Sequence, residues 1–280
     1  MKKIILLGNK NKKRVRETIT ELEPLFRKRA HVSIIDISDE GETDGLSADL
    51  AFVFGGDGAI LAACRKLNGK QIPMIGVHLG KFGFLAELTT QEVSQTLEKI
   101  FAGKYVISQR MLLACQVIRS KQVIKETSGL NDAVISRSSL SRLISIKLYI
   151  NGKEVTTYSS DGLIISTPSG STAHSLSAGG PVVTPDMDAF IITPICPHTL
   201  SNRPLVVSGD SKIEMEQVSD SKGVGLTIDG QIYTDIVAND KIRVEKAKEK
   251  LHLIDTQTRT FYDVLREKLN WRGHPTYNVN

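Results

Sequence analysis

The sequence contains few aromatic residues and no long hydrophobic run near its start, and each shortage excludes a class of protein. Aromatic residues make up 5% of the 280 residues, too few for the basic and stacking surface of a single-strand nucleic-acid binder. Only four apolar residues, Ile4–Leu7, precede Gly8, which is too short for a signal peptide or a membrane span. We therefore expect a cytoplasmic protein that binds neither nucleic acid nor membrane.

Cysteine is also scarce. Cys64, Cys115 and Cys196 lie far apart and in no metal-ligand spacing. This pattern argues against a disulfide framework and against a structural zinc site, so we expect reduced cysteines in the core. The net charge of +5 favours an anionic small-molecule partner such as a nucleotide.

The common enzyme signatures are absent as well. The sequence has no Gly-x-Gly-x-x-Gly, no protein-kinase His-Arg-Asp or Asp-Phe-Gly, no Gly-x-Ser-x-Gly and no His-Glu-x-x-His. Residues 76–82 include the glycines and the lysine of a P-loop, but they lack its spacing and the Ser or Thr that follows the lysine. The common signatures of NTPases, dehydrogenases and hydrolases are therefore absent.

An alternation of strands and helices in residues 1–108 predicts the first domain. Apolar runs predict strands at Lys3–Leu7, Val32–Ile37, Asp49–Phe54 and Ile72–Val77, and helical spacing predicts helices at Lys13–Arg29, 59–67 and Thr90–Ala102. This order is typical of an open, mostly parallel α/β sheet, whose ligands bind at the carboxyl ends of the strands.

Residues 109–251 have a different pattern. Short β-type runs alternate with turn residues, and Asn151-Gly152 is a strong hairpin signal. We predict a second, β-rich domain over 109–251. The remaining residues, 252–280, with a final helix at Thr260–Trp271, are expected to pack back on the first domain.

The run Gly55-Gly56-Asp57-Gly58 lies between a predicted strand and a predicted helix. Glycines can take positive φ and let a ligand approach the backbone, and the N–H groups at a helix start attract phosphate. Asp57 would repel a phosphate unless it binds a metal or accepts a proton from a nucleophile. From these residues alone, an ordinary tight turn remains the alternative.

Two further stretches offer polar groups to a ligand. In Asp161–Pro181, Ser171 or Thr172 is expected to cap a short helix, and the hydroxyls of Ser171, Thr172, Ser175 and Ser177 can bond ring nitrogens or sugars. Asn131-Asp132 can hold ribose hydroxyls, although such a pair also begins turns. For both stretches, a packed structural turn remains the alternative.

Taken together, these motifs resemble those of the bacterial-type NAD kinases over most of the chain. The matching segments are Gly55–Gly58, the Gly76–Leu85 loop, Asn131-Asp132, Asp161-Gly162 with Thr167–Ala173, and Pro197–Leu200 with Arg203–Leu205. One such motif is weak, because lipid kinases also carry Gly-Gly-Asp-Gly, but the whole set in this order is specific.

The resemblance implies a kinase that phosphorylates the 2′-hydroxyl of the adenosine ribose of NAD, with a divalent metal, most simply Mg²⁺, and ATP or polyphosphate as donor. It implies an active site in the cleft between the two domains and a homodimer or homotetramer. Asp57 would be the general base, and Gly55, Gly56 and Gly58 would face the donor phosphates. The residues implied to bind NAD are Asp57, Gly58, Phe84, Asn131, Asp132, Arg142, Asp161, Thr172, Ala173, His174, Ser175, Leu176, Ser177 and Gln231.

The match has one clear departure. The family usually has a tyrosine where this chain has His174, so an aromatic wall is replaced by a smaller, titratable ring. Two other functions stay open: a lipid kinase, disfavoured because Asp161–Pro181 suits a polar dinucleotide, and a non-catalytic nucleotide-binding regulator.

Overall fold

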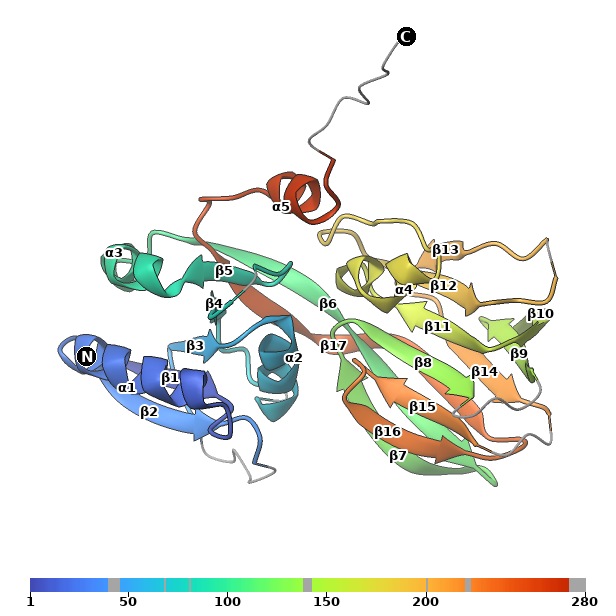
Figure 1. Cartoon of the computed structure of the whole chain (residues 1–280). Coiled ribbons are helices and arrows are strands. Elements are labelled where there is room, and N and C mark those ends of the chain that lie inside the picture. Colours follow the sequence, from blue (N-terminus) through green and yellow to red (C-terminus); the bar gives the residue numbers. More distant parts are fainter. Residues whose placement is uncertain are drawn as a thin grey trace, which may run out of the picture. The chain divides into compact units, whose positions relative to one another are not determined.

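The computed structural model describes residues 1–39, 46–67, 69–80, 82–137, 143–199, 201–219 and 223–271. The chain separates into two compact units, Met1–Ser108 with His252–Asn280, and Gln109–Leu251 (Figure 1). Strands β6 (Val106–Arg119) and β17 (Lys241–Asp255) each run from one unit into the other. No helix among the described residues has both the length and the apolar character that crossing a bilayer requires.

The first unit is an α/β fold around a parallel sheet. Its sheet order is β2-β1-β3-β4, and both β5 and the end of β17 pair with β4. The prediction of a mostly parallel α/β sheet is therefore confirmed. Its elements are β1 (Lys2–Gly8), α1 (Lys13–Arg27), β2 (Ala30–Asp36), β3 (Leu50–Phe54), α2 (Asp57–Lys66), β4 (Met74–His78), β5 (Ala86–Thr89), α3 (Thr90–Phe101) and α5 (Phe261–Lys268).

Alternating side chains of these strands pack against helices. Ile4 of β1 and Phe52 of β3 share a buried cluster with residues of α1 and α3, such as Phe26 and Leu97. Each residue of this kind is fully removed from water, which stabilises the fold by roughly 1.5–3 kcal/mol per large apolar side chain. Because the strands are parallel, their carboxyl ends lie along one edge of the sheet, where the loops after β1, β2, β3 and β4 begin.

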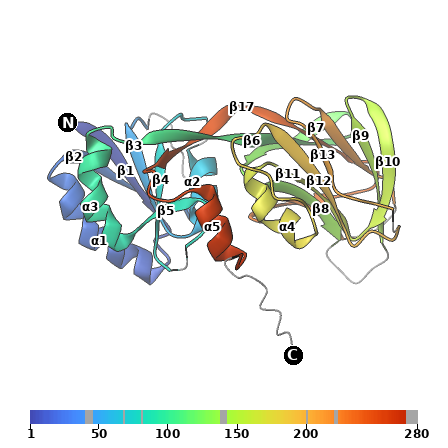
Figure 2. The same cartoon turned by 90° about the horizontal axis from the view of Figure 1, so that it is seen from above.

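The second unit is built almost entirely from antiparallel strands, as Figure 2 shows in a second view. One sheet has the order β13-β12-β11-β8-β15-β16, and the other strands pair with β17 directly or through a neighbour. The elements are β7 (Gln122–Gly129), β8 (Asp132–Arg137), β9 (Ile144–Ile150), β10 (Lys153–Ser160), β11 (Gly162–Ser166), the 3-10 helix η1 (Ser169–Thr172), α4 (His174–Ser177), β12 (Ala189–Ile195), β13 (Leu205–Ser208), β14 (Ile213–Gln217), β15 (Val224–Ile228) and β16 (Ile232–Ile236).

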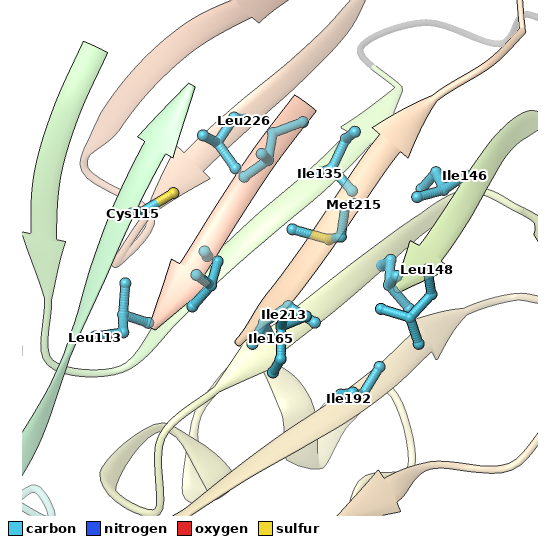
Figure 3. Packing of buried hydrophobic residues seen from close by; sticks show 14 of the residues in the cluster. Leu113, Cys115, Ile135, Ile146, Leu148, Ile165, Ile192, Ile213, Met215 and Leu226 are labelled. Carbon is cyan, nitrogen blue, oxygen red and sulfur yellow. The ribbon is translucent and has the colours of Figure 1, made fainter. Parts of the chain in front are cut away.

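Inward-facing side chains from both groups of strands form one core in this unit. Figure 3 shows Leu113, Ile135, Ile165 and Met215 meeting there from four strands. The predicted hairpin is also present, because Asn151 and Gly152 have φ of 52° and 76° between the antiparallel β9 and β10. Such paired positive φ values match the right-handed twist of the flanking strands.

The cysteine prediction is correct in part. All three cysteines are unbridged, and Cys115 is buried, which raises the pKa of its thiol to about 12. Cys64 is half-buried and Cys196 is exposed, so the expectation that all three lie in the core is wrong. Cys196 follows the end of β12 in a turn and has a φ of 44°.

Candidate active site

Asp57 is placed by a glycine turn at the carboxyl edge of the first unit's sheet. Gly55 follows β3 with a φ of 151°, which favours glycine, and its N–H donates to the Val77 carbonyl at 3.0 Å. A Cβ at Gly55 would lie 2.6 Å from that of Ala59. Helix α2 begins at Asp57, two residues earlier than predicted, so Gly58 is helical and only Gly55 of the three glycines has a positive φ.

The Asp57 carboxylate is held by two backbone amides of the loop that follows β4. The Phe84 N–H donates to Oδ2 at 2.8 Å and the Leu85 N–H donates to Oδ1 at 3.1 Å. Gly83 allows this approach, since a Cβ there would lie 2.0 Å from Oδ1. Each oxygen keeps a second lone pair, so the carboxylate is oriented and can still accept a hydrogen bond from a ligand.

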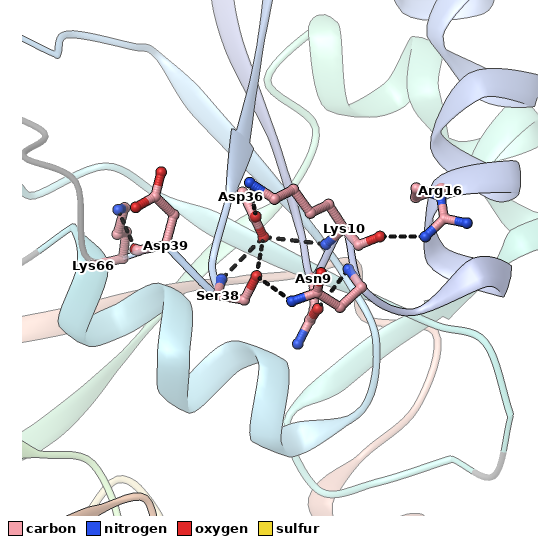
Figure 4. A network of polar contacts seen from close by, with 8 residues as sticks. Asn9, Lys10, Arg16, Asp36, Ser38, Asp39 and Lys66 are labelled. Atoms are coloured by element: carbon pink, nitrogen blue, oxygen red, sulfur yellow. Dashed lines mark hydrogen bonds and ion pairs between the residues drawn. The ribbon is translucent and has the colours of Figure 1, made fainter.

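A second carboxylate at the same sheet edge has a purely structural arrangement. Asp36, at the end of β2, accepts hydrogen bonds from the Lys10 and Ser38 N–H groups and the Ser38 hydroxyl, and pairs with the Lys10 ammonium at 3.0 Å (Figure 4). Burial works to raise the pKa of Asp36, but these hydrogen bonds outweigh it and lower the pKa. The network fixes the basic loop after β1.

In the second unit, Asn131 and Asp132 lie against the turn after β11. The Thr167 N–H donates to the Asn131 carbonyl at 2.8 Å, and the Thr167 hydroxyl donates to the Leu130 carbonyl at 2.5 Å. Gly170 packs so closely that a Cβ there would lie 2.0 Å from the Asn131 oxygen. The structure thus brings together two of the stretches that the sequence singled out.

Asp229 completes this group and was missed by the sequence analysis. Its carboxylate accepts hydrogen bonds from the N–H groups of Leu130, Asn131 and Asp132, at 3.1, 2.7 and 3.2 Å for the shortest contact of each. The available signal was Asp229-Gly230, a hairpin dipeptide just before Gln231. Burial and, to a lesser extent, the neighbouring Asp229 charge raise the pKa of Asp132 to about 7.

The short helices after β11 differ from the prediction. Pro168 and Ala173, not Ser171 or Thr172, occupy the N-cap positions of η1 and α4. The Ser171 hydroxyl is buried and bonded to the backbone of Pro168 and Val183.

The hydroxyl of Ser175 is buried too, in a 2.9 Å hydrogen bond with Thr193. The prediction that the Ser171 and Ser175 hydroxyls face a ligand is therefore wrong. Thr172, Ala173 and Leu176 are half-buried, and His174 and Ser177 are exposed.

The remaining predicted residues are more scattered. Asp161 stands at the opposite end of β11 from Thr167, about 20 Å along the strand at 3.3 Å per residue, and pairs with Arg137 at 2.8 Å. Gln231 is exposed in the β15–β16 turn, and Phe84 is half-buried in the first unit. Arg142 lies outside the described residues.

In the described parts of the chain, no three His, Cys, Asp or Glu residues gather where their side chains could hold a metal ion. Mg²⁺ at phosphoryl-transfer sites is held by one or two carboxylates together with substrate phosphates. A single carboxylate such as that of Asp57 could share a metal with phosphate oxygens in this way.

Comparison with known proteins finds that both units match domains of one protein family. Residues 6–105 match the ATP-NAD kinase N-terminal domain and residues 130–256 match the ATP-NAD kinase C-terminal domain. The chain is 44% identical to an NAD kinase of Geobacter metallireducens over 80% of this chain and 79% of that one. It is 37% identical to the Geobacter sulfurreducens NAD kinase over 97% and 99% of the two chains.

Solved structures agree in fold. Yeast NADH kinase complexed with NADH superimposes with a TM-score of 0.82 at 25% identity, covering 97% of this chain and 89% of that one. An NAD kinase from Archaeoglobus fulgidus in complex with ATP gives 0.78 at 24% identity, covering 96% and 100%. Two family domains in sequence, relatives of this identity along nearly the whole length, and an oriented aspartate after a glycine turn lead to one conclusion: the chain belongs to the NAD kinase family.

Proposed function

We propose that this kinase transfers the terminal phosphoryl group of ATP to the 2′-hydroxyl of the adenosine ribose of NAD, giving NADP and ADP, with Asp57 as the general base. The observation that carries the proposal is the Asp57 carboxylate, oriented by the amides of Phe84 and Leu85 directly after the Gly55-Gly56 turn. A base within hydrogen-bond reach of the hydroxyl contributes roughly 10²- to 10⁴-fold to such a reaction.

Asp57 would accept the proton of the 2′-hydroxyl as that oxygen attacks phosphorus. The bond from phosphorus to the leaving oxygen of ADP breaks, and the electron pair stays on ADP. Phosphoryl transfer depends mainly on alignment and charge neutralisation. The N–H groups at the start of α2 and the Gly55-Gly56 backbone would face the donor phosphates, while Mg²⁺ bound to those phosphates would supply the remaining positive charge.

The acceptor would be held mainly by the second unit. Asn131 and Asp132 would bond the ribose hydroxyls, and Thr172, Ala173, His174 and Ser177 would lie along the dinucleotide. Support comes from the close packing of Asn131 against the Thr167–Gly170 turn. Yeast NADH kinase was solved with NADH and the A. fulgidus enzyme with ATP, and we assign the corresponding ligands to this chain.

We further propose a homodimer or homotetramer that works in the cytoplasm. Asp161 lies far from Asn131 along β11 within one chain. A contact of Asp161 with NAD is therefore easier to satisfy from a second copy, which makes the oligomer part of the proposal. Polyphosphate remains the alternative donor.

The test is NADP formation by the purified protein with NAD, ATP and Mg²⁺, followed by a dehydrogenase that accepts only NADP. Asp57→Asn keeps the size of the side chain and removes the base. We expect it to lose roughly 10²- to 10⁴-fold in kcat, while calorimetry still detects NAD binding.

Asp188→Asn is the matched control, since it removes a surface carboxylate of the other unit that pairs with Lys246. It should retain wild-type turnover. Failure to form NADP with either ATP or polyphosphate would overturn the proposed activity, and an Asp57→Asn enzyme with normal kcat would overturn the role of Asp57.

A further inference from the structure

The segment after β17, Thr256–Phe261, lies against the loop and strand that follow β4, and all of these residues belong to the first unit. We call this segment the strap. Three of its side-chain contacts reach residues 82–87, the stretch whose amides hold Asp57. Each contact comes from a different kind of interaction, so together they fix the position of the stretch at several points.

The first contact is a hydrogen-bonded carboxylate. Glu87 of β5 accepts hydrogen bonds from the Thr256 N–H at 3.2 Å and the Thr256 hydroxyl at 2.6 Å. The Thr258 hydroxyl adds a longer one at 3.4 Å. Burial raises the pKa of Glu87 in spite of these donors. A partly buried carboxylate held in this way ties the strap to the start of β5.

The second contact places a charge over an aromatic ring. The Arg259 guanidinium lies over the Phe82 ring, 4.5 Å from its centroid, and pairs with Glu92 at 3.6 Å. Glu92 is itself fixed, because it forms a capping box with Thr89 at the start of α3. A cation over a ring at this distance stabilises the pair by about 0.5–1 kcal/mol at an exposed site.

Phe82 also contacts the residue that ends β4. His78 packs edge-on against Phe82 with ring centroids 5.1 Å apart, and its Nδ1 donates to the Gly80 carbonyl at 3.0 Å. Phe82 thus contacts both the histidine at the end of β4 and the arginine of the strap. It lies two residues before Phe84, whose N–H donates to Asp57.

The third contact joins two phenylalanines. Phe261, the first residue of α5, lies 6.4 Å from Phe84 between ring centroids. Phe84 is also the residue whose N–H donates to Asp57 Oδ2. The strap therefore touches the same residue that orients the carboxylate.

We propose that the strap positions the catalytic base, with Arg259 as its main positioning residue, acting through Phe82 and the amides of Phe84 and Leu85. The proposal rests on the assigned role of Asp57 as general base. Arg259 itself touches neither the carboxylate nor the reacting atoms. Loss of Arg259 would loosen the loop and let Asp57 rotate, and small misplacements of a reacting group can lower a rate by up to about 10²-fold.

Arg259→Gln tests this directly. We expect kcat to fall about tenfold while the KM for NAD and for ATP stay within about twofold. Arg259→Lys keeps a cation over Phe82 but loses the planar guanidinium, so it should recover part of kcat. Phe82→Leu, which removes the ring under Arg259, should lower kcat to a similar degree.

Arg29→Gln is the control. Arg29 also pairs with a glutamate of α3, Glu98, at 2.7 Å, and within the part of the chain that the structure describes none of its hydrogen bonds or ion pairs reaches residues 82–87. It should leave kcat unchanged. If Arg29→Gln and Arg259→Gln lower kcat equally, the effect is general to the unit and the proposal is wrong.

Two measurements separate this proposal from the assignment of Asp57. In an Asp57→Asn background, Arg259→Gln should change the residual kcat less than twofold, because its effect passes through Asp57. A further tenfold loss there would overturn the positioning role. Hydrogen exchange of the Phe84 and Leu85 amides, measured without substrate, should quicken in Arg259→Gln, and unchanged exchange would also overturn it. An Asp57→Asn enzyme with full turnover would instead refute the base assignment.

Discussion

Asp57 and Asp132 are carboxylates assigned to one reaction, and the protein holds them by opposite means. Asp57 is half-buried and receives two backbone N–H groups. Asp132 is 4% exposed and lies beside Asp229, which accepts the nearby N–H groups itself. Burial and, to a lesser extent, the neighbouring Asp229 charge raise the pKa of Asp132 to about 7. The first unit therefore fixes the orientation of one carboxylate, while the second favours the protonated form of the other.

The largest expected effect comes from closing the space in front of Asp57. Gly83→Ala would place a Cβ 2.0 Å from Asp57 Oδ1, so the carboxylate or the loop must move. We expect kcat to fall about 10²-fold, with little change in NAD affinity, because the other carboxylate is untouched. Steady-state kinetics with calorimetric binding would measure both.

Gly80→Ala is the matched control from the same loop, since a Cβ there meets nothing within 4 Å. It should retain wild-type kcat. Full activity in Gly83→Ala would mean that the approach of the loop to Asp57 has no part in turnover.

The corresponding change in the second unit should affect binding and stability instead. Gly170→Ala would place a Cβ 2.0 Å from the Asn131 carbonyl oxygen, and the three nearest atoms all belong to the Asn131 backbone, so no side chain can move to relieve the clash. Overpacking of this kind costs about 1–3 kcal/mol of unfolding free energy, and the displaced Asn131-Asp132 should weaken NAD binding several-fold. Urea unfolding and calorimetry would test it; a loss of kcat without a loss of affinity would contradict the division of roles.

The smallest effect concerns the proton on Asp132. Its pKa is about 7 in the folded protein, against a reference value of 3.8. The folded state therefore binds more protons between pH 4 and 7, so this group lowers the free energy of unfolding as pH rises through that range.

Asp132→Asn removes this contribution. From pH 5 to pH 6.5, the stability of the variant should rise relative to wild type by about 1–2 kcal/mol. Urea titrations at both pH values would measure the difference. Parallel pH dependence in the two proteins would show that Asp132 ionises normally.

Much of the first unit could be predicted because its strands are continuous apolar runs and its helices have clear periodicity. Strands β5 and β7 were missed for physical reasons. The alternation of buried Ala86 and Leu88 in β5 covers only four residues, which is too short to distinguish from a loop, and most of β7 is exposed, so it has no buried apolar face. Strand β17 runs from Lys241 to Asp255, and its charged middle carries little apolar signal from which its length could be predicted.

The candidate site was predictable where the chemistry resides in side chains and unpredictable where it depends on the backbone. Asp57 and Asn131-Asp132 were identified from their types and order. The amides that orient Asp57 lie 27 and 28 residues further along the chain, and an N–H group has no residue type to mark it. Likewise, no pattern indicates whether the Ser171 and Ser175 hydroxyls point inward, since that depends on the packing of β12 and the segment before it.

The division of the first unit into two separated segments has a consequence for biosynthesis. A ribosome releases residues in order, and the second unit, 109–251, is contiguous. Its sheets can therefore close before the strap exists. The first unit is complete only when His252 and the residues after it have been synthesised. A nascent chain halted near residue 250 would therefore contain the Gly55–Gly58 turn and the loop that holds Asp57, but not the strap that contacts this loop.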